Sequence, residues 1–216
     1  GNLLDLIELE LNNNLLQSTS LFPIASWSKL VVLDVSSNPG LEGEFPDLSG
    51  LTELRELGWS NTSISGTLPD SIAQVTNLVT LNLAYNQLTS WNATAVCALD
   101  LVWLDVSHND LTGSLPDLAS CSQLLHCDLS HNLFVGCFTH LSLPDRLRTL
   151  KVSHNLLTCD HEPMDIVFPS LTTLDVSGNT FASRLTSVFL QEPGYIHATS
   201  TGWLCPVPEG EFVSED

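Results

Sequence analysis

The chain has 216 residues, and its 25 aspartates and glutamates outnumber its 6 lysines and arginines, which gives a formal net charge of −19. Because like charges repel at long range, this balance argues against nucleic acid or an anionic membrane as a partner. A basic ligand, a neutral glycan or peptide, or divalent cations would be better matched, although the same charge would also serve only to keep the protein soluble. No segment approaches the roughly 18 apolar residues that span a bilayer, so we expect no direct membrane insertion.

One phrase recurs along almost the whole chain, with leucines at its first, fourth and sixth positions and asparagine at its ninth. An early copy runs from Leu30 to Asn38 and a later copy from Leu101 to Asn109. The ninth position recurs every 23 or 24 residues, at Asn14, Asn38, Thr62, Asn86, Asn109, Asn132, Asn155 and Asn179. A fixed period of this size predicts a solenoid in which each coil packs only against its neighbours.

Within each copy, apolar and polar residues alternate, which is the period of a β-strand. We therefore expect leucines such as Leu78, Leu81 and Leu83 to point inward and the stacked coils to form a parallel sheet. The ninth residue turns the chain, and its side chain can bond to backbone groups that the turn leaves unpaired, so the asparagines are predicted to be structural. Thr62 can supply part of that bonding. A full α-helix would not fit comfortably on the outer face of so short a coil, where we expect short 3₁₀ turns or extended segments.

A second phrase, Leu-x-Gly-x-Leu-Pro, follows the first in close variants at residues 41–48, 64–71 and 111–118. Glycine permits a tight bend, and proline fixes an extended course after it. The two phrases together resemble the plant-type extracellular leucine-rich repeats of receptor-like kinase ectodomains, polygalacturonase-inhibiting proteins and some protist surface antigens. The resemblance covers almost the whole chain. The second phrase is degraded at residues 88–91 and 134–137, which leaves room there for a different course on the side and outer faces.

The predicted architecture is a leucine-rich repeat solenoid of about eight full coils plus a degenerate C-terminal coil. Its parallel sheet lies on the concave face, and short 3₁₀ or extended segments lie on the convex face. The repeats occupy residues 1–184 without a visible N-terminal cap, so we interpret the chain as a mature product or a fragment. Residues 185–208 are predicted to form a capping coil, which ends in a Cys-Pro-Val-Pro segment similar to the closure of protist repeat domains. Residues 209–216 form an acidic tail.

Four of the six cysteines fall at nearly equivalent places in adjacent coils. Cys97 and Cys121 precede their ninth positions by similar distances, and Cys137 and Cys159 follow theirs. Neighbouring strands lie about 4.8 Å apart, which is compatible with disulfide geometry. The sequence therefore predicts the disulfides Cys97–Cys121 and Cys137–Cys159.

The other two cysteines and two sequons complete the chemical inventory. Cys127 occupies an inward leucine position and is predicted to be a buried free thiol, whereas Cys205 has no obvious partner. The glycosylation sequons begin at Asn61 and Asn92. Together with the disulfides they indicate the secretory pathway and an extracellular or cell-surface location.

The outward residues of the strands line the concave face, where equivalent positions stack into columns, including a column of seventh positions that are nearly all serine. We expect Trp103 to be exposed there, because its position faces away from the core. An exposed tryptophan near tyrosine and charged groups is typical of a binding hot spot, although a lone surface tryptophan is not rare. The candidate ligand-binding residues are Tyr85, Trp103, Asp105, His126 and Asp128. By contrast, Trp59 falls in an inward position, and Trp27 and Trp91 are expected to pack on the outer or side faces.

Segments 105–108 and 128–131 contain the Asp, Ser and His of a hydrolase triad. Serine and histidine are adjacent in both, so their side chains diverge at the strand end, whereas a nucleophile needs its base within about 3 Å. We therefore assign no catalytic residue and no cofactor, and predict that the protein is not an enzyme.

A column of eighth-position histidines, His108, His131 and His154, has the residue type to bind a transition metal or respond to pH. The alternative, which we favour, is that they are solvated rim residues of a common repeat consensus, and no metal site is assigned. Three charged residues of the fifth-position column are expected to form an ion-pair ladder: Asp128, Lys151 and Asp175.

The leading hypothesis is an extracellular protein- or glycan-recognition module of a receptor ectodomain or surface glycoprotein. It would bind a protein, peptide or glycan ligand, including a basic one, through its concave face. The alternative is a structural component of a larger extracellular or cell-surface assembly, whose partners are further segments of the same polypeptide or assembly. A third hypothesis, an enzyme inhibitor, rests only on the resemblance to the polygalacturonase inhibitors. The sequence does not identify the ligand.

Overall fold

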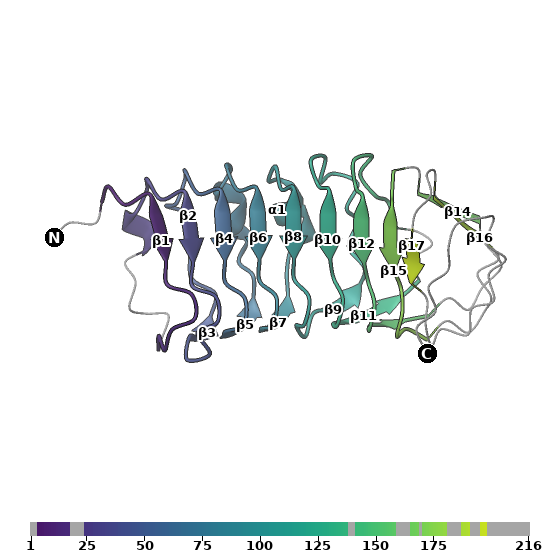
Figure 1. Ribbon diagram of the computed structural model, residues 1–216, viewed down its shortest axis with the longest axis horizontal. Helices are drawn as coiled ribbons and strands as arrows, with labels where there is room; N and C mark the ends of the chain where they lie inside the picture. The colour runs from purple at the N-terminus through teal and green to yellow at the C-terminus, as the bar shows by residue number, and fades with distance from the viewer. Residues whose placement is uncertain are drawn as a thin grey trace.

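The computed structural model describes residues 4–17, 24–137, 141–158, 165–168, 170–180, 187–190 and 195–197. Within these ranges, nine short strands form one parallel sheet in which spatial order follows chain order, as Figure 1 shows. The strands are β1 (Glu8–Glu10), β2 (Val32–Asp34), β4 (Glu56–Gly58), β6 (Thr80–Asn82), β8 (Trp103–Asp105), β10 (His126–Asp128), β12 (Thr149–Lys151), β15 (Thr173–Asp175) and β17 (Tyr195–His197). The chain is therefore a parallel β-solenoid.

The core consists of leucine-rich columns that run along the stack. From β2 to β15, the middle residue of each strand points inward, and successive middle residues are Cα partners. At most 1% of each of these residues is exposed: Leu33, Leu57, Leu81, Leu104, Cys127, Leu150 and Leu174. The inward positions predicted from the repeat are confirmed, and so is the core position of Trp59, which is 0% exposed. Each fully buried leucine stabilises the stack by about 1.5–3 kcal/mol relative to an exposed one.

A second set of strands follows the turn in most described coils. One side sheet contains β3 (Glu42–Glu44), β5 (Ser63–Thr67) and β7 (Gln87–Ser90). Another contains β9 (Thr112–Ser114), β11 (Leu133–Gly136) and β13 (Leu156–Leu157). Two further strands pair with each other: β14 (Asp165–Phe168) and β16 (Ser187–Leu190).

The glycine of the second phrase lies inside these side strands. Gly66 and Gly113 have φ angles of 81° and 92°, a left-handed conformation that side chains rarely adopt. Gly136, in one of the degraded phrases, keeps a φ of 88°, and its strand still pairs with β9. The side strands therefore persist where the phrase is degraded, with one register shift between Gly66 and Thr67.

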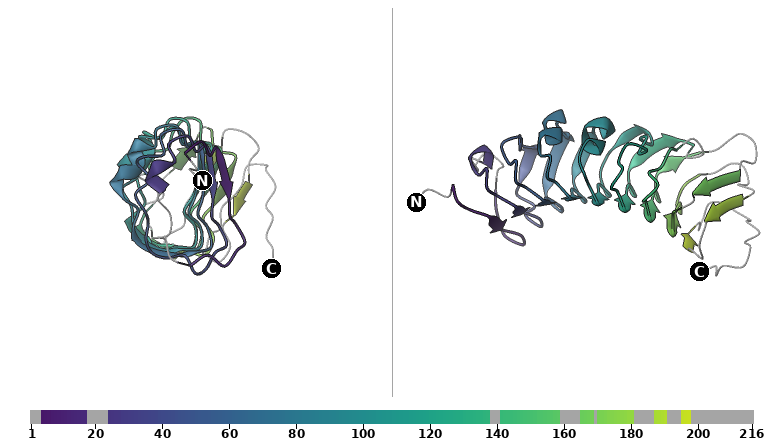
Figure 2. Two further views of the ribbon diagram at one scale, coloured as in Figure 1. Left: turned by 90° about the vertical axis from the view of Figure 1, so that its left-hand side faces the viewer. Right: turned by 90° about the horizontal axis from the view of Figure 1, so that it is seen from above.

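Short helices lie opposite the nine-stranded sheet. They are the 3₁₀ helices η2 (Ile24–Ser26) and η3 (Asp70–Gln74) and the α-helix α1 (Ala93–Cys97). Figure 2 shows them on the outer side of the curved stack, with the sheet along its inner, concave side. The α-helix corrects the expectation of 3₁₀ or extended segments alone. It forms because the Asn92 side chain caps it, accepting a hydrogen bond from Thr94 N at 3.1 Å, and because it buries Ala95 and Val96. None of the helices in the described ranges could cross a membrane.

The repeated asparagines tie adjacent coils together through the backbone. Asn132 donates from Nδ2 to the carbonyl oxygen of Val106, 3.0 Å away in the preceding coil, and to two carbonyl oxygens of its own coil. Its Oδ1 accepts from Leu111 N at 3.0 Å. At the exceptional position, Thr62 donates from Oγ1 to Asn86 Oδ1 at 2.6 Å, so threonine replaces part of the bonding. The structural role predicted for the buried asparagines is confirmed, whereas Asn14 is exposed and bonds only within its own turn.

The predicted disulfide between Cys97 and Cys121 is present, with its Cα atoms 4.3 Å apart. It joins α1 to the next coil. Cys137 is also disulfide-bonded. Because its predicted partner Cys159 lies outside the described residues, that pairing stays a prediction. Cys127 is a buried free cysteine, as expected, and burial raises the pKa of its thiol far above the usual range.

The C-terminal coil is described only at its strands. Ile196 of β17 is the Cα partner of Leu174 in β15, which is the register counted from the repeat. The rest of the predicted capping coil, including Cys205, and the acidic tail 209–216 lie outside the described residues.

Candidate functional site

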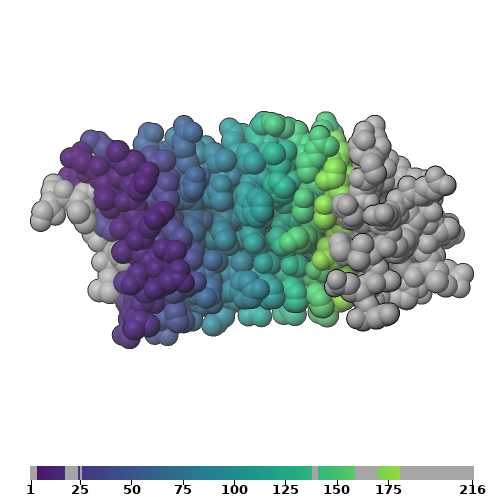
Figure 3. Space-filling model, in the orientation of Figure 1, coloured from purple at the N-terminus to yellow at the C-terminus, as the bar shows by residue number. Residues whose placement is uncertain are grey.

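One exposed column of the concave face consists of the first residues of the strands, and it contains an aromatic pair. Trp103 and His126 are the first residues of β8 and β10 and are Cα partners. Because side chains alternate along a strand, the inward course of Leu104 turns Trp103 outward, where it is 44% exposed. Its ring centroid lies 4.8 Å from that of His126, with the planes tilted by 39°. Figure 3 shows this face of the molecule, along which the chain advances steadily from the first repeats to the later ones.

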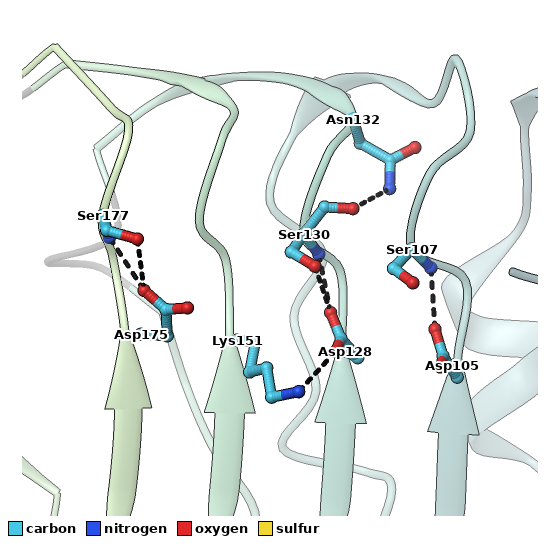
Figure 4. A network of polar contacts seen from close by, with 8 residues as sticks. All are labelled: Asp105, Ser107, Asp128, Ser130, Asn132, Lys151, Asp175 and Ser177. Atoms are coloured by element: carbon cyan, nitrogen blue, oxygen red, sulfur yellow. Dashed lines mark hydrogen bonds and ion pairs between the residues drawn. The ribbon is translucent and has the colours of Figure 1, made fainter. Parts of the chain in front are cut away.

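Aspartates occupy the last position of four of the strands, β2, β8, β10 and β15, and Figure 4 shows the last three of these aspartates. Asp105, Asp128 and Asp175 each accept a hydrogen bond from the N–H group of the serine two residues later, at 3.0 Å. One carboxylate oxygen therefore closes the turn that ends the strand. The second oxygen remains available for other contacts, and we call these three residues the acidic column.

The predicted ion-pair ladder is only half formed. Lys151 Nζ lies 3.0 Å from Asp128 Oδ2, and this hydrogen bond raises the pKa of the lysine. Within the described part of the chain, Asp175 forms no ion pair with Lys151. Instead, its Oδ1 accepts both the N–H and, at 2.7 Å, the hydroxyl of Ser177.

Asp105 is the member of the acidic column whose surroundings favour the ionised carboxylate least. Among the described residues, no cation lies within ion-pair distance of it. Burial raises the pKa of its carboxyl group, and Ser107 lowers it through two hydrogen bonds. The negative charge of Asp128 raises the pKa further, and the positive charge of Lys151 has a smaller, lowering effect. An incoming cation would relieve the remaining cost, because it would place a positive charge in direct contact with the carboxylate.

Four rings stack along the rim of the concave face, and we call them the rim stack. Tyr85 and His108 have centroids 3.9 Å apart and planes 11° from parallel, and His108 and His131 are 3.9 Å and 12° apart. His131 and His154 follow at 4.2 Å and 13°. All four residues share a left-handed backbone with φ between 51° and 57°, which orients each ring alike in successive coils. The stack ends at Gly178, where a Cβ atom would come within 2.6 Å of His154 Nδ1.

His131 and His154 are exposed and His108 is half-buried, so the histidines are rim residues in contact with solvent, as expected, and their rings also stack on one another. Burial lowers the pKa of His131, and the charges of His108 and His154 lower it further, against the opposing effect of Asp128 and Asp175. Parallel rings present faces, not converging nitrogen atoms, to each other. In the ranges that the structure describes, no group of three or more potential ligands could hold a metal ion.

The five candidate ligand-binding residues fall into two groups. Trp103, Asp105, His126 and Asp128 occupy β8 and β10 as directly opposed pairs. Tyr85 makes its ring contact with His108 and belongs to the rim stack. Repeat counting places Tyr85 in the same eighth-position column as the three histidines. The structure adds that the four rings stack on one another.

The seventh-position serines are not part of the exposed surface in the middle of the stack, contrary to expectation. Ser107, Ser130 and Ser153 are 5%, 5% and 4% exposed, because the chain has already turned inward at this position. Ser130 Oγ donates to Asp128 Oδ1 at 2.5 Å, which uses this hydroxyl to hold the turn. Both sequon asparagines are exposed, Asn61 on the rim and Asn92 at the start of α1, and their glycosylation stays a prediction.

Comparison with known protein families matches residues 52–111 to the family Leucine rich repeat. No curated protein matches the chain. Together with the fold, the family match shows that the chain contains a leucine-rich repeat domain.

Solved plant structures share this fold. The plant peptide hormone receptor RGFR1 in complex with RGF2 is similar with a TM-score of 0.73 and 25% identity, over 93% of this chain and 33% of that one. A plant ice-binding protein gives a TM-score of 0.73 and 24% identity, over 98% and 70%. The Arabidopsis receptor kinase HAESA, in complex with the peptide hormone IDA and the co-receptor SERK1, gives 0.63 and 22%, over 91% and 38%. The chain thus spans about a third of the length of the two receptor chains.

Proposed function

We propose that this leucine-rich repeat domain is a non-catalytic, extracellular recognition module of a receptor ectodomain or surface glycoprotein, and that it binds its ligand through the concave face. The observation that carries the proposal is the exposed indole of Trp103 in the middle of the sheet, paired with His126 and beside Asp105. A large aromatic surface next to a poorly compensated charge is the composition of a binding hot spot.

The surface chemistry favours a protein or peptide ligand with a basic group. A ligand cation would lie against Asp105 and be attracted by the net charge of −19. Its apolar part, or a guanidinium plane, would pack on the Trp103 ring. A glycan could also stack on the indole, but it would leave the charge of Asp105 uncompensated. The similar receptors were solved with peptide hormones, which supports a peptide ligand by analogy.

A preformed surface lowers the entropic cost of binding. The residues of β8 and β10 are held by the parallel sheet and by the aspartate–serine turns, so little ordering is required when a ligand arrives. The Cys97–Cys121 disulfide and the exposed sequon asparagines support passage through an oxidising secretory compartment.

The test is a binding screen with secreted, glycosylated protein against arrays of basic, acidic and neutral peptides and of neutral glycans. Wild-type protein is compared with Trp103→Ala and with Val135→Ser, which changes an exposed apolar residue of a side sheet. We expect basic peptides to be captured by wild type and Val135→Ser and to be lost with Trp103→Ala. Capture of the same ligands by all three proteins would contradict the proposed site.

A structural role in a larger assembly is the second candidate, and one feature favours it. Leu133, Val135 and Leu156 are 41%, 45% and 53% exposed on β11 and β13, where Val135 and Leu156 are directly opposed. An apolar patch on the side of the solenoid suits packing against another protein surface. Sedimentation of wild type and Val135→Ser tests this candidate, because an assembly component should self-associate through the patch and Val135→Ser should weaken that association. An enzyme inhibitor would be a special case of the first candidate, with an enzyme as ligand.

A further inference from the structure

The rim stack lies along the same concave surface as the acidic column, and the two are linked by the chain. His108 follows Asp105 by three residues and His131 follows Asp128 by three, so a stacked imidazole and a carboxylate belong to the same strand-to-turn segment. Any change of charge in the stack therefore occurs near the carboxylates that, under the proposed function, bind a cationic ligand.

Protonation opposes stacking at His131 because this ring has an imidazole on each face. Its neighbours are 3.9 Å and 4.2 Å away, measured between ring centroids. At about 4 Å, two positive charges repel enough to lower proton affinity about fivefold even in bulk water. Face-to-face contact that is favourable between neutral rings is thus lost when adjacent rings are charged.

The charged groups around His131 act in both directions. His108 and His154 face it within the stack and disfavour its protonation, whereas Asp128 and Asp175 on β10 and β15 favour it. On the intervening strand β12, Lys151 is paired with Asp128 and so reduces the help that this carboxylate gives.

We propose that the rim stack is a pH-responsive element of the binding surface: acidification charges and separates the rings, and the added positive charge weakens the hold of the acidic column on a cationic ligand. The second half of this inference rests on the proposed function, and the first half does not. The lowered pKa of His131 agrees with a ring that is neutral at pH 7 at the centre of the stack.

The sign of the stability effect follows from that direction. The pKa of His131 is lowered in the folded state and returns to the usual histidine value of about 6.5 when the chain unfolds. Below this pH, the unfolded chain therefore binds more protons than the folded protein. The stabilisation from the stack is therefore complete above this pH and is lost as the pH falls through the window below it.

Tyrosine is the natural replacement, since Tyr85 already occupies the stack with the same left-handed φ. The triple variant His108→Tyr/His131→Tyr/His154→Tyr keeps aromatic rings but does not titrate near neutrality. The double variant His108→Tyr/His154→Tyr keeps His131 and removes its charged neighbours. Val135→Ser serves as a control, because Val135 lies on β11 of a side sheet, outside the stack and outside the proposed site.

The first experiment follows the imidazole signal of His131 by NMR between about pH 7.5 and pH 5, a range that brackets histidine titration. We expect the protonation midpoint of His131 to rise in the double variant. Thermal stability should fall more steeply with acidification in wild type than in the triple variant. Unchanged midpoints and parallel stability profiles would overturn the pH-responsive stack, whether or not any ligand binds. If the triple variant does not fold, His131→Tyr alone provides the same stability comparison.

The second experiment measures binding of a fluorescein-labelled tetra-arginine peptide by anisotropy at about pH 7.5 and pH 5, at fixed low ionic strength. One added charge at about 8 Å weakens binding of a cation roughly twofold in water, so a charged stack should weaken it roughly four- to eightfold. The triple variant keeps the aspartates but lacks the three histidines, so its loss of affinity on acidification should be smaller by that factor, whereas Val135→Ser should behave like wild type. Equal losses in wild type and the triple variant would overturn the link to binding. Equal binding by wild type and Trp103→Ala at pH 7.5 would instead count against the proposed function and leave the NMR result standing.

Discussion

The ring of Trp103 lies 4.8 Å from that of His126, and the two residues start adjacent strands in direct register. The same register places Asp105 opposite Asp128 at the other end of these strands. An exposed aromatic pair and a carboxylate pair thus share two neighbouring coils. Because Asp128 is paired with Lys151 and Asp105 has no described cation within ion-pair distance, β8 and β10 differ in what they offer a cationic ligand.

Replacing Asp105 with asparagine should stabilise the fold while it weakens binding. Asn82 shows that asparagine can make the same turn, since its Oδ1 accepts from Ala84 N at 3.1 Å. The raised pKa of Asp105 means that its ionised form is disfavoured on folding, so the cost is present near neutral pH and disappears as pH falls below the usual aspartate range. After allowance for solvent screening, we expect Asp105→Asn to gain about 0.5 kcal/mol at neutral pH.

Urea unfolding of Asp105→Asn and wild type, repeated from neutral to acidic pH, measures this difference. The advantage of Asp105→Asn should shrink toward zero on acidification. A gain that is independent of pH, or a loss at neutral pH, would show that the ionised carboxylate is well accommodated in the free protein.

Removing a buried asparagine should be among the most damaging polar substitutions. Asn132→Ala deletes three donated hydrogen bonds and one accepted bond, and leaves buried backbone groups of two coils without partners. We expect a loss of about 2–4 kcal/mol, measured by urea unfolding. Asn14→Ala is the matched control, because Asn14 is exposed and bonds only within its turn. Similar losses in the two variants would mean that the bonds between coils carry little of the stability.

The Cys97–Cys121 disulfide closes a segment with a sequence separation of 24 residues. For a loop of this size, the restriction of the unfolded chain is worth about 3 kcal/mol. The variant Cys97→Ala/Cys121→Ala should therefore unfold at lower urea concentration and still show the near-ultraviolet signal of the native aromatic core. Cys127→Val is the control for loss of a cysteine without loss of a bond. A double variant as stable as Cys127→Val would contradict a stabilising disulfide.

The repeat made the main sheet predictable residue by residue. Once Leu104 and Cys127 are assigned to equivalent positions, the pairing of Trp103 with His126 follows from counting alone. The Cys97–Cys121 disulfide follows in the same way, because equivalent positions of adjacent coils must be neighbours. The side strands were less predictable, since Gly136 keeps its left-handed conformation in a phrase that lacks the proline.

The features that sequence reasoning missed depend on side-chain direction after the turn. Ser130 and His131 are adjacent, yet one is buried against Asp128 and the other joins the rim stack. The alternation of side chains along a strand does not predict this, because the left-handed φ of His131 redirects its side chain relative to the strand. The short helix α1 likewise depends on a local feature, the Asn92 cap, and not on the repeat phrase.

The central claim is that the concave face recognises a ligand through Trp103. The most direct measurement is the dissociation constant of the peptide captured in the screen, determined by calorimetry for wild type, Trp103→Ala and Val135→Ser. Because Trp103 is exposed, Trp103→Ala should unfold at nearly the wild-type urea concentration, so a binding loss would not reflect misfolding. We predict that Trp103→Ala binds at least about thirtyfold more weakly, as expected for a hot-spot residue, and that Val135→Ser binds like wild type. Equal affinities for Trp103→Ala and wild type would contradict the claim.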